Sequence, residues 1–175
     1  LGVGAAKFHT GGSAGESDTV YLGVFKREAI NAIGGFDEHF TRAQDWELNF
    51  RLRKNGGKIY FDQRLTVTYR PRRSLAALAK QYFEYGRWRR VVARTHKGTI
   101  NLRYLAPPFT VIGTTASLLA GIFAPILFVP AAIYGSFLIL ASLKIGKNFK
   151  ERFYLPAILF TMHMSWGVGF ITSTR

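Results

Sequence analysis

Two acidic residues, Asp45 and Glu47, stand at the start of a predicted helix in the run QDWELNFRLRK. The first turn of a helix has backbone N–H groups without intrahelical acceptors, and these groups favour a carboxylate. An ionised carboxylate held at a cleft can take a proton from a substrate hydroxyl, whereas simple N-terminal capping explains the same residues without chemistry. Because side chains two positions apart do not share a helix face, one can face a cleft while the other faces a basic neighbour.

Four further residues are candidates for binding. Asp37 and Glu38 follow two glycines and a phenylalanine in a predicted loop, and loops on rigid scaffolds often carry binding groups, although a solvated turn explains these acids equally well. Arg87 presents a fork of donors that matches phosphate oxygens. Trp88 can stack on a sugar or lie at a membrane interface. The alternative is that Arg87 and Trp88 simply reach into lipid headgroups.

The composition excludes several kinds of site. The 175 residues include no cysteine, which excludes disulfides and thiolate metal sites. His9, His39 and His96 lack the spacing of metal ligands, and no glycine-rich phosphate loop of the P-loop or dinucleotide type is present. We therefore predict no metal site within this chain. With 48% hydrophobic residues, the chain is also too apolar for a disordered basic tail.

The elements that must position these residues follow from hydrophobic patterns and turn signals. In chain order we predict a strand at 19–25, a helix at 26–33, a helix at 44–54, and strands at 58–61 and 65–69. Gly34 and Gly35 follow the first helix and Asn55 to Gly57 follow the second, as expected for helix ends.

A long basic helix is predicted next, over 75–96, with Ser74 as its N-cap. Residues 42–104 hold 16 of the 24 basic residues and only 4 of the 10 acidic ones. An amphipathic helix with such charges suits the headgroup layer of a membrane. An ordinary surface helix on a soluble domain is the other interpretation, and both can hold at different turns.

Residues 105–143 contain no Asp, Glu, Lys, Arg or His. A helix of 39 residues would be about 58 Å long, and a bilayer core of about 30 Å therefore accommodates two helices rather than one. We predict membrane helices at 107–124, 127–143 and 153–172. The alternative is the apolar core of a soluble protein. His163 lies in the third segment, and we expect it to be a neutral histidine that forms a hydrogen bond between helices.

Basic residues flank the uncharged stretch on both sides and predict cytoplasmic flanks by the positive-inside rule. They are Arg94, Lys97 and Arg103 before it, and Lys144, Lys147, Lys150 and Arg152 after it. We therefore expect a multi-pass protein of the inner or plasma membrane with its soluble part in the cytoplasm.

The run GGFDEHFTRAQDWELNFRLRKNGG at 34–57 resembles the C-terminal half of the catalytic domain of family 2 glycosyltransferases, which have the GT-A fold. QDWEL is similar to the family's Glu-Asp-x-Glu/Asp-Leu segment, and the resemblance implies that Asp45 is the catalytic base. Gln44 stands where the family usually has Glu. The runs DTVYLGVFKREAI, YRPRRSLAALAKQYFEYGRW and HMSWGVGF resemble the succinoglycan-biosynthesis branch of membrane glycosyltransferases.

The resemblance also implies a substrate-binding set. The stretch from Gln81 to Trp88 is similar to the Gln-x-x-Arg-Trp motif of processive polysaccharide synthases, with a different spacing. The implied substrate-binding residues are Asp37, Glu38, Gln44, Glu47, Arg87 and Trp88.

The implied architecture is α/β followed by an all-α membrane region of about three helices. Residues 1–73 would be the C-terminal part of a GT-A domain, 74–104 a juxtamembrane helix and linker, and 105–175 the membrane helices. The implied function is inverting, hexosyltransferase-type transfer from a nucleotide-sugar to a lipid-linked or polysaccharide acceptor, as in exopolysaccharide biosynthesis. The family binds the donor and Mg or Mn through an Asp-x-Asp motif, which this sequence lacks, so we expect a fragment that is inactive alone.

Two other classes compete with a transferase. A non-catalytic membrane anchor or scaffold with a basic cytoplasmic face requires no acid at position 45. Nucleic-acid binding is suggested by the basic segment with its interleaved aromatic residues, but a position beside membrane lipids explains those charges more simply. We therefore expect no nucleic-acid partner.

Overall fold

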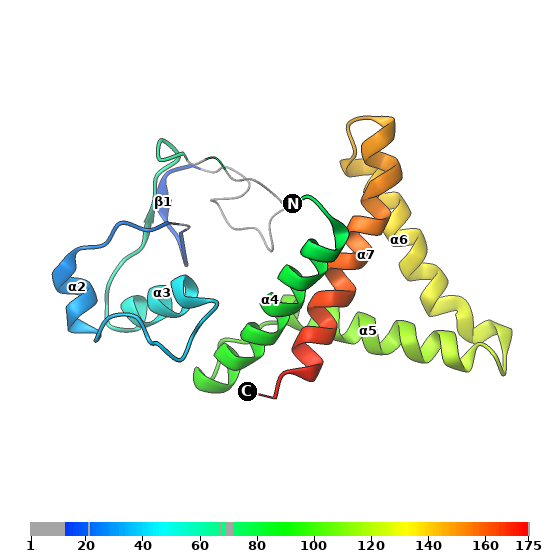
Figure 1. The fold of residues 1–175 in the computed structure, drawn as a ribbon, viewed down its shortest axis with the longest axis horizontal. Coiled ribbons are helices and arrows are strands. Elements are labelled where there is room, and N and C mark those ends of the chain that lie inside the picture. The colour runs from blue at the N-terminus through cyan, green and yellow to red at the C-terminus, as the bar shows by residue number, and fades with distance from the viewer. Residues whose placement is uncertain (1–12, 21, 67, 69–71, 175) are drawn as a thin grey trace. The chain divides into compact units, whose positions relative to one another are not determined.

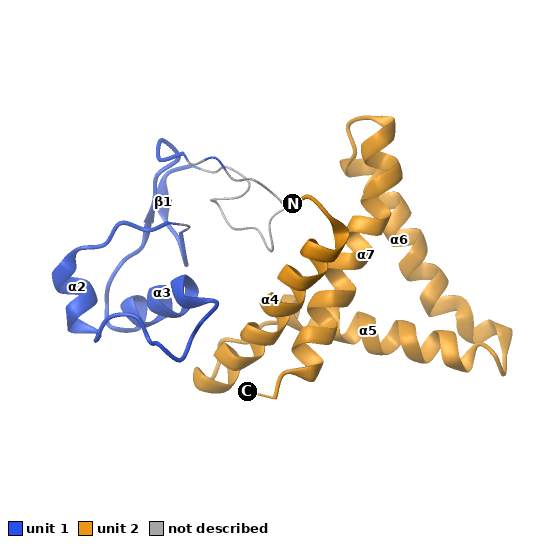
Figure 2. Ribbon diagram, in the orientation of Figure 1, with its two compact units in different colours: residues 1–70 blue, residues 71–175 orange. Residues whose placement is uncertain are grey.

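The chain folds into two compact units. The computed structural model describes residues 13–20, 22–66, 68 and 72–174. Unit 1 comprises residues 1–70 and unit 2 comprises residues 71–175 (Figure 2).

Unit 1 contains two helices and two short strands among its described residues (Figure 1). They are β1 (Gly15–Glu16), α2 (Arg27–Ala32), α3 (Gln44–Lys54) and β2 (Tyr60–Phe61). The strands pair antiparallel, with Gly15 opposite Phe61. Both predicted helices and the strand near residue 60 are confirmed.

The predicted strand at 19–25 is wrong, since its described residues form no strand. Leu22 has a φ of 52°, which lies outside the extended region, so the run cannot continue as a strand. Val20 and Phe25 instead pack against the core of unit 1. The predicted strand at 65–69 includes residues 67 and 69, which lie outside the described residues.

The core of unit 1 lies under α3. Leu48 and Leu52 on α3 pack with Ile59 beside β2, and all three side chains are buried. Because Leu48 and Leu52 are four residues apart, they share one face of α3. This face fixes the helix on which Asp45 lies.

The regular elements described in unit 2 are all helices. In chain order these are α4 (Leu75–Thr95), α5 (Leu102–Ala120), the short 3-10 helix η1 (Pro125–Phe128), α6 (Val129–Ile145) and α7 (Phe149–Thr172). The predicted capping of α4 is confirmed, because the Ser74 hydroxyl accepts a hydrogen bond of 3.2 Å from the Ala77 N–H.

Helices α4 and α7 run side by side, as Figure 1 shows. Two glycines permit this approach. A Cβ atom at Gly86 would lie 1.9 Å from the carbonyl oxygen of Trp166, and one at Gly169 would lie 2.0 Å from that of Phe83. No side chain fits at such distances, so the two backbones are in direct contact.

The end of α7 is fixed by polar contacts from α4. The Arg90 guanidinium donates to the carbonyl oxygens of Phe170 and Ile171 at 2.9 and 2.7 Å. The Ser173 hydroxyl donates to the Arg87 carbonyl at 3.2 Å. The last carbonyls of a helix have no intrahelical donors and carry the negative end of its dipole, so a cation from α4 stabilises this end.

Aromatic rings fill the space between α4, α5 and α7. Tyr82, Trp166 and Phe170 are buried together, and Tyr104 packs against them. The Arg89 guanidinium lies 3.9 Å from the centre of the Tyr104 ring and donates to the Thr99 carbonyl. Burial lowers the pKa of Arg89 from its ordinary value. The middle of α4 therefore packs within the protein, against α7 and α5.

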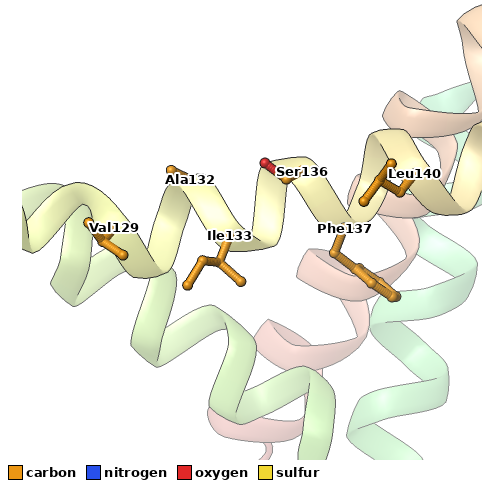
Figure 3. Close-up of a pocket in the computed structure, with 6 residues that line it drawn as sticks. All are labelled: Val129, Ala132, Ile133, Ser136, Phe137 and Leu140. Carbon is orange, nitrogen blue, oxygen red and sulfur yellow. The ribbon is translucent and has the colours of Figure 1, made fainter.

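Two helical stretches in the described part are long and apolar enough to cross a membrane, Pro125–Ile145 and Phe149–Thr172. The predicted span at 107–124 corresponds to α5, which is not one of them. One face of α6 forms an open apolar groove (Figure 3), lined by Val129, Ala132, Ile133, Ser136, Phe137 and Leu140. The expected hydrogen bond of His163 is confirmed, since its Nδ1 lies 3.2 Å from the Tyr134 hydroxyl on α6.

The close approach of α4 and α7 predicts a stability effect. We expect Gly86→Ala to destabilise the protein by about 1–3 kcal/mol, because the added methyl forces the two backbones apart. Gly113→Ala on α5 is the matched control, since a Cβ there meets no atom within 4 Å. Thermal unfolding in detergent, followed by tryptophan fluorescence, compares the two. Equal midpoints for both variants and the parent would contradict the described packing.

Candidate functional site

Asp45 is an exposed carboxylate in the first turn of α3. No hydrogen bond or ion pair of its side chain occurs among the described residues. The residue before the helix, Ala43, has φ 64° and ψ 16°, and it provides no side-chain cap. A non-glycine residue in this left-handed region is strained. The turn into α3 is thus held by its surroundings, and Asp45 is left available at the surface of unit 1.

Glu47 has the opposite environment. It is 1% exposed, and both carboxylate oxygens accept hydrogen bonds from Arg51. The distances are 2.6 Å from Arg51 Nε to Oε1 and 2.8 Å from a terminal nitrogen of Arg51 to Oε2. This fork-to-fork pairing is among the strongest side-chain interactions. Because both acceptor oxygens bind Arg51, Glu47 has a structural role in unit 1. Its predicted substrate contact stays a prediction.

Arg51 also binds the backbone after α2. Its two terminal nitrogens donate to the carbonyl oxygens of Ile33 and Gly35, each at 2.7 Å. Hydrogen bonding and charge attraction from Glu47 raise the pKa of Arg51 above its ordinary value, with a smaller contribution from the charge of Asp37. The guanidinium therefore stays charged and joins α3 to the beginning of the following loop.

The loop between α2 and α3 holds the other predicted acids. The Asp37 carboxylate accepts a hydrogen bond of 2.9 Å from the His39 N–H and so closes a local turn. Phe40 is buried and anchors the loop. Glu38 and Gln44 are exposed. The structure thus places Asp37, Glu38, Gln44 and Asp45 along one short stretch of chain.

A second contact fixes α3 from its other side. The Asn49 amide on α3 donates to the Thr19 hydroxyl at 2.8 Å, and Asn49 is fully buried. Thr19 lies in the irregular run that replaces the predicted strand. This run therefore supports α3 through a polar contact as well as through Val20 and Phe25.

Three other acids of unit 1 are paired with cations. Glu16 binds Lys58 at 2.6 Å, Asp18 lies 3.4 Å from Arg53, and Asp62 binds Arg64 at 2.7 Å. Hydrogen bonds from Arg64 lower the pKa of Asp62 to about 2. No group of three His, Cys, Asp or Glu able to hold a metal occurs in the described residues. This donor set does not fit a divalent cation.

Arg87 and Trp88 lie on α4 in unit 2 and share a partner. Arg87 lies 3.6 Å from a carboxylate oxygen of Glu84, and the Trp88 indole N–H donates to Glu84 at 3.2 Å. Trp88 is 2% exposed. Little of the Trp88 ring is therefore accessible in this structure, and its predicted sugar contact stays a prediction. Arg87 is half-buried, and its phosphate-binding role stays a prediction.

Arg51 is the residue that we did not single out from the sequence. Its spacing from Glu47, four positions further along a helix, is a recognised signal for an ion pair. The spacing does not reveal that the same guanidinium also binds the backbone carbonyls of Ile33 and Gly35, which lie before α3 in the chain. Chemically, unit 1 presents one exposed carboxylate on a helix fixed by a buried ion pair.

Comparison with known proteins identifies the family. A glycosyl transferase family 21 sequence model matches residues 11–174, and the chain belongs to this family. The succinoglycan biosynthesis protein ExoA of Rhizobium meliloti (strain 1021) is 28% identical over 172 residues, which cover 97% of this chain and 52% of that protein.

A second relative comes from Methanococcus voltae. It is a dolichyl N-acetyl-alpha-D-glucosaminyl phosphate 3-beta-D-2,3-diacetamido-2,3-dideoxy-beta-D-glucuronosyltransferase, 29% identical over 157 residues, with 88% of this chain and 46% of that protein covered. The chain therefore spans about half the length of the curated relatives it matches. No solved structure matches the chain significantly.

Replacing each acid of α3 with its amide should have different effects on stability, because one acid is buried and the other is exposed. We expect Glu47→Gln to lower the free energy of unfolding by about 3–5 kcal/mol, because it leaves the Arg51 charge without its buried counterion. Asp45→Asn is the matched control, and we expect it to change stability by less than about 0.5 kcal/mol, as is usual at exposed positions. Thermal or denaturant unfolding measures both. A stable Glu47→Gln variant would contradict the structural role of Glu47.

Proposed function

We propose that this chain is part of a membrane-bound, inverting glycosyltransferase in which Asp45 is the catalytic base. The observation that carries the proposal is the contrast on α3. Glu47 is buried and paired, whereas Asp45 is exposed and has no side-chain partner in the described part of unit 1. Membership of glycosyl transferase family 21 supports the reaction class.

The proposed step is a single displacement. The Asp45 carboxylate takes the proton of an acceptor hydroxyl, and the acceptor oxygen forms a bond to the anomeric carbon of the donor sugar. The bond from that carbon to the phosphate oxygen breaks, and the nucleoside diphosphate leaves with the bonding electrons. In this step Asp45 acts as the general base and carries the proton away from the acceptor.

The donor and the metal belong to a part of the enzyme that lies outside this half-length match. Mg or Mn, which the family resemblance implies, would neutralise the leaving phosphates. The acids described in unit 1 do not fit such a site, because no group of three His, Cys, Asp or Glu that could hold a metal occurs among the described residues. We therefore propose that this chain supplies the base and the acceptor side, in the cytoplasm.

Unit 2 supports a lipid-linked acceptor. Its α6 exposes a continuous apolar face, and α6 and α7 have the length and composition of membrane spans. Apolar helices of this kind belong in a bilayer. An enzyme held at the bilayer surface meets a lipid-linked sugar in two dimensions, so we propose an acceptor with a lipid anchor in preference to a free glycan.

The base assignment predicts the effect of one substitution. In the full-length enzyme, we expect Asp45→Asn to lower turnover at least about a hundredfold, since a positioned general base contributes about 10²–10⁴ in rate. Donor affinity, measured by calorimetry, should change less than about twofold, because the base contacts the acceptor. Asp62→Asn, which removes another carboxylate of unit 1, is the control. Wild-type turnover in Asp45→Asn would refute the assignment.

The acceptor proposal is tested with two forms of one acceptor. We expect kcat/KM of the full-length enzyme in liposomes to be at least about tenfold higher for a lipid-linked sugar than for the same sugar without its lipid, because membrane attachment raises the effective concentration. Assays in detergent micelles, where the surface is dispersed, should reduce this preference. Equal kcat/KM for both acceptors in liposomes would contradict a lipid-linked substrate.

A further inference from the structure

We propose that Arg51 is a positioning residue for the transferase reaction, because it fixes the loop at 34–43 that leads into Asp45. The proposal rests on the proposed function for its catalytic consequence. Its structural part, the restraint of the loop by one guanidinium, stands on the contacts alone.

Arg51 makes four hydrogen bonds in two directions. Two of them hold the Glu47 carboxylate within α3, and two reach the carbonyl oxygens of Ile33 and Gly35 at the beginning of the loop. The Arg51 side chain is 20% exposed and that of Glu47 is 1% exposed, so water screens this network little. Hydrogen bonds from a charged donor that is shielded from water are strong.

Glu47 connects the two ends of the loop. Its backbone N–H donates to the Ala43 carbonyl at 2.9 Å, at the far end, while its side chain holds Arg51, which binds the near end. The chain from Gly35 to Ala43 is thus closed by one residue pair. This closure supplies the surroundings that keep Ala43 in its strained left-handed conformation.

The conformation of Ala43 decides where α3 begins and therefore where Asp45 lies, two residues further along. If the near end of the loop were released, Ala43 could relax toward ordinary backbone angles. The carboxylate would then move relative to the acceptor hydroxyl. A displacement of about 1 Å at a reacting group costs up to about a hundredfold in rate.

Lysine cannot replace Arg51 in this arrangement. A single ammonium group can bind the Glu47 carboxylate, but it lacks the planar fork that reaches the carboxylate and both carbonyls together. Arg51→Lys therefore keeps the charge and releases the loop. Arg64→Lys is the matched control, because Arg64 also forks onto a carboxylate, that of Asp62, yet it holds no distant backbone.

The test compares Arg51→Lys, Arg64→Lys and the parent as full-length enzymes, at a temperature where thermal unfolding shows all three to be folded. The first readout is the rate at which trypsin cleaves after Arg42, the exposed arginine within the loop, followed by mass spectrometry. The second is kcat and the KM for donor and acceptor.

We expect Arg51→Lys to speed cleavage after Arg42 at least about fivefold and to lower kcat at least about tenfold, with the donor KM changed less than about twofold. Arg64→Lys should match the parent in both readouts. Unchanged cleavage after Arg42 would overturn the proposal. So would faster cleavage with an unchanged kcat, provided that Asp45→Asn is inactive. If Asp45→Asn is fully active, the proposed function fails, and the cleavage readout alone then decides whether Arg51 holds the loop.

Discussion

The buried pairing of Glu47 with Arg51 is the interaction on which unit 1 depends. A carboxylate and a guanidinium are costly to remove from water, and this cost is recovered only if nearly all their hydrogen-bonding capacity is used. Here the carboxylate receives two bonds, and the guanidinium gives two of its three other N–H donors to Ile33 and Gly35. The pair therefore specifies one loop geometry, in addition to any net stabilisation. Of the two acids in the QDWEL segment, Glu47 is buried and stabilises the scaffold, whereas Asp45 is exposed.

Unit 2 depends on a different constraint, the absence of side chains where α4 meets α7. Gly86 and Gly169 bring polar backbone together, and Arg90 then reaches the carbonyls at the end of α7. Close contact through small residues is a common way for helices to associate in membranes, where hydrophobic burial provides little driving force. Cations lie at both ends of α7, Lys150 at its start and Arg90 against its end. Charge alone therefore does not orient this helix across a bilayer.

The sequence predicted local features well and long-range ones poorly. The bounds of α3 follow from the apolar spacing and the Asn55–Gly57 stop signal, and both depend only on neighbours in the chain. The missed features depend on distant partners. The run at 19–25 has β-prone side chains, but packing against α3 and the backbone of Leu22 determine its shape. The burial of Trp88 likewise depends on packing between helices, which the sequence does not show. The assignment of Asp45 as the base comes from the family resemblance of its segment and stays a prediction.

The partnership between α4 and α7 has a consequence for biosynthesis. Gly86 leaves the ribosome about 80 residues before Trp166, the α7 residue that its backbone packs against, and at about 5–20 residues per second this delay is on the order of ten seconds. During that interval the aromatic face of α4 around Tyr82 has no helix to cover it. Hydrophobic surface that is exposed in this way is prone to aggregation until its partner helix arrives. Once α7 has emerged, it covers this face and completes the packing around Tyr82.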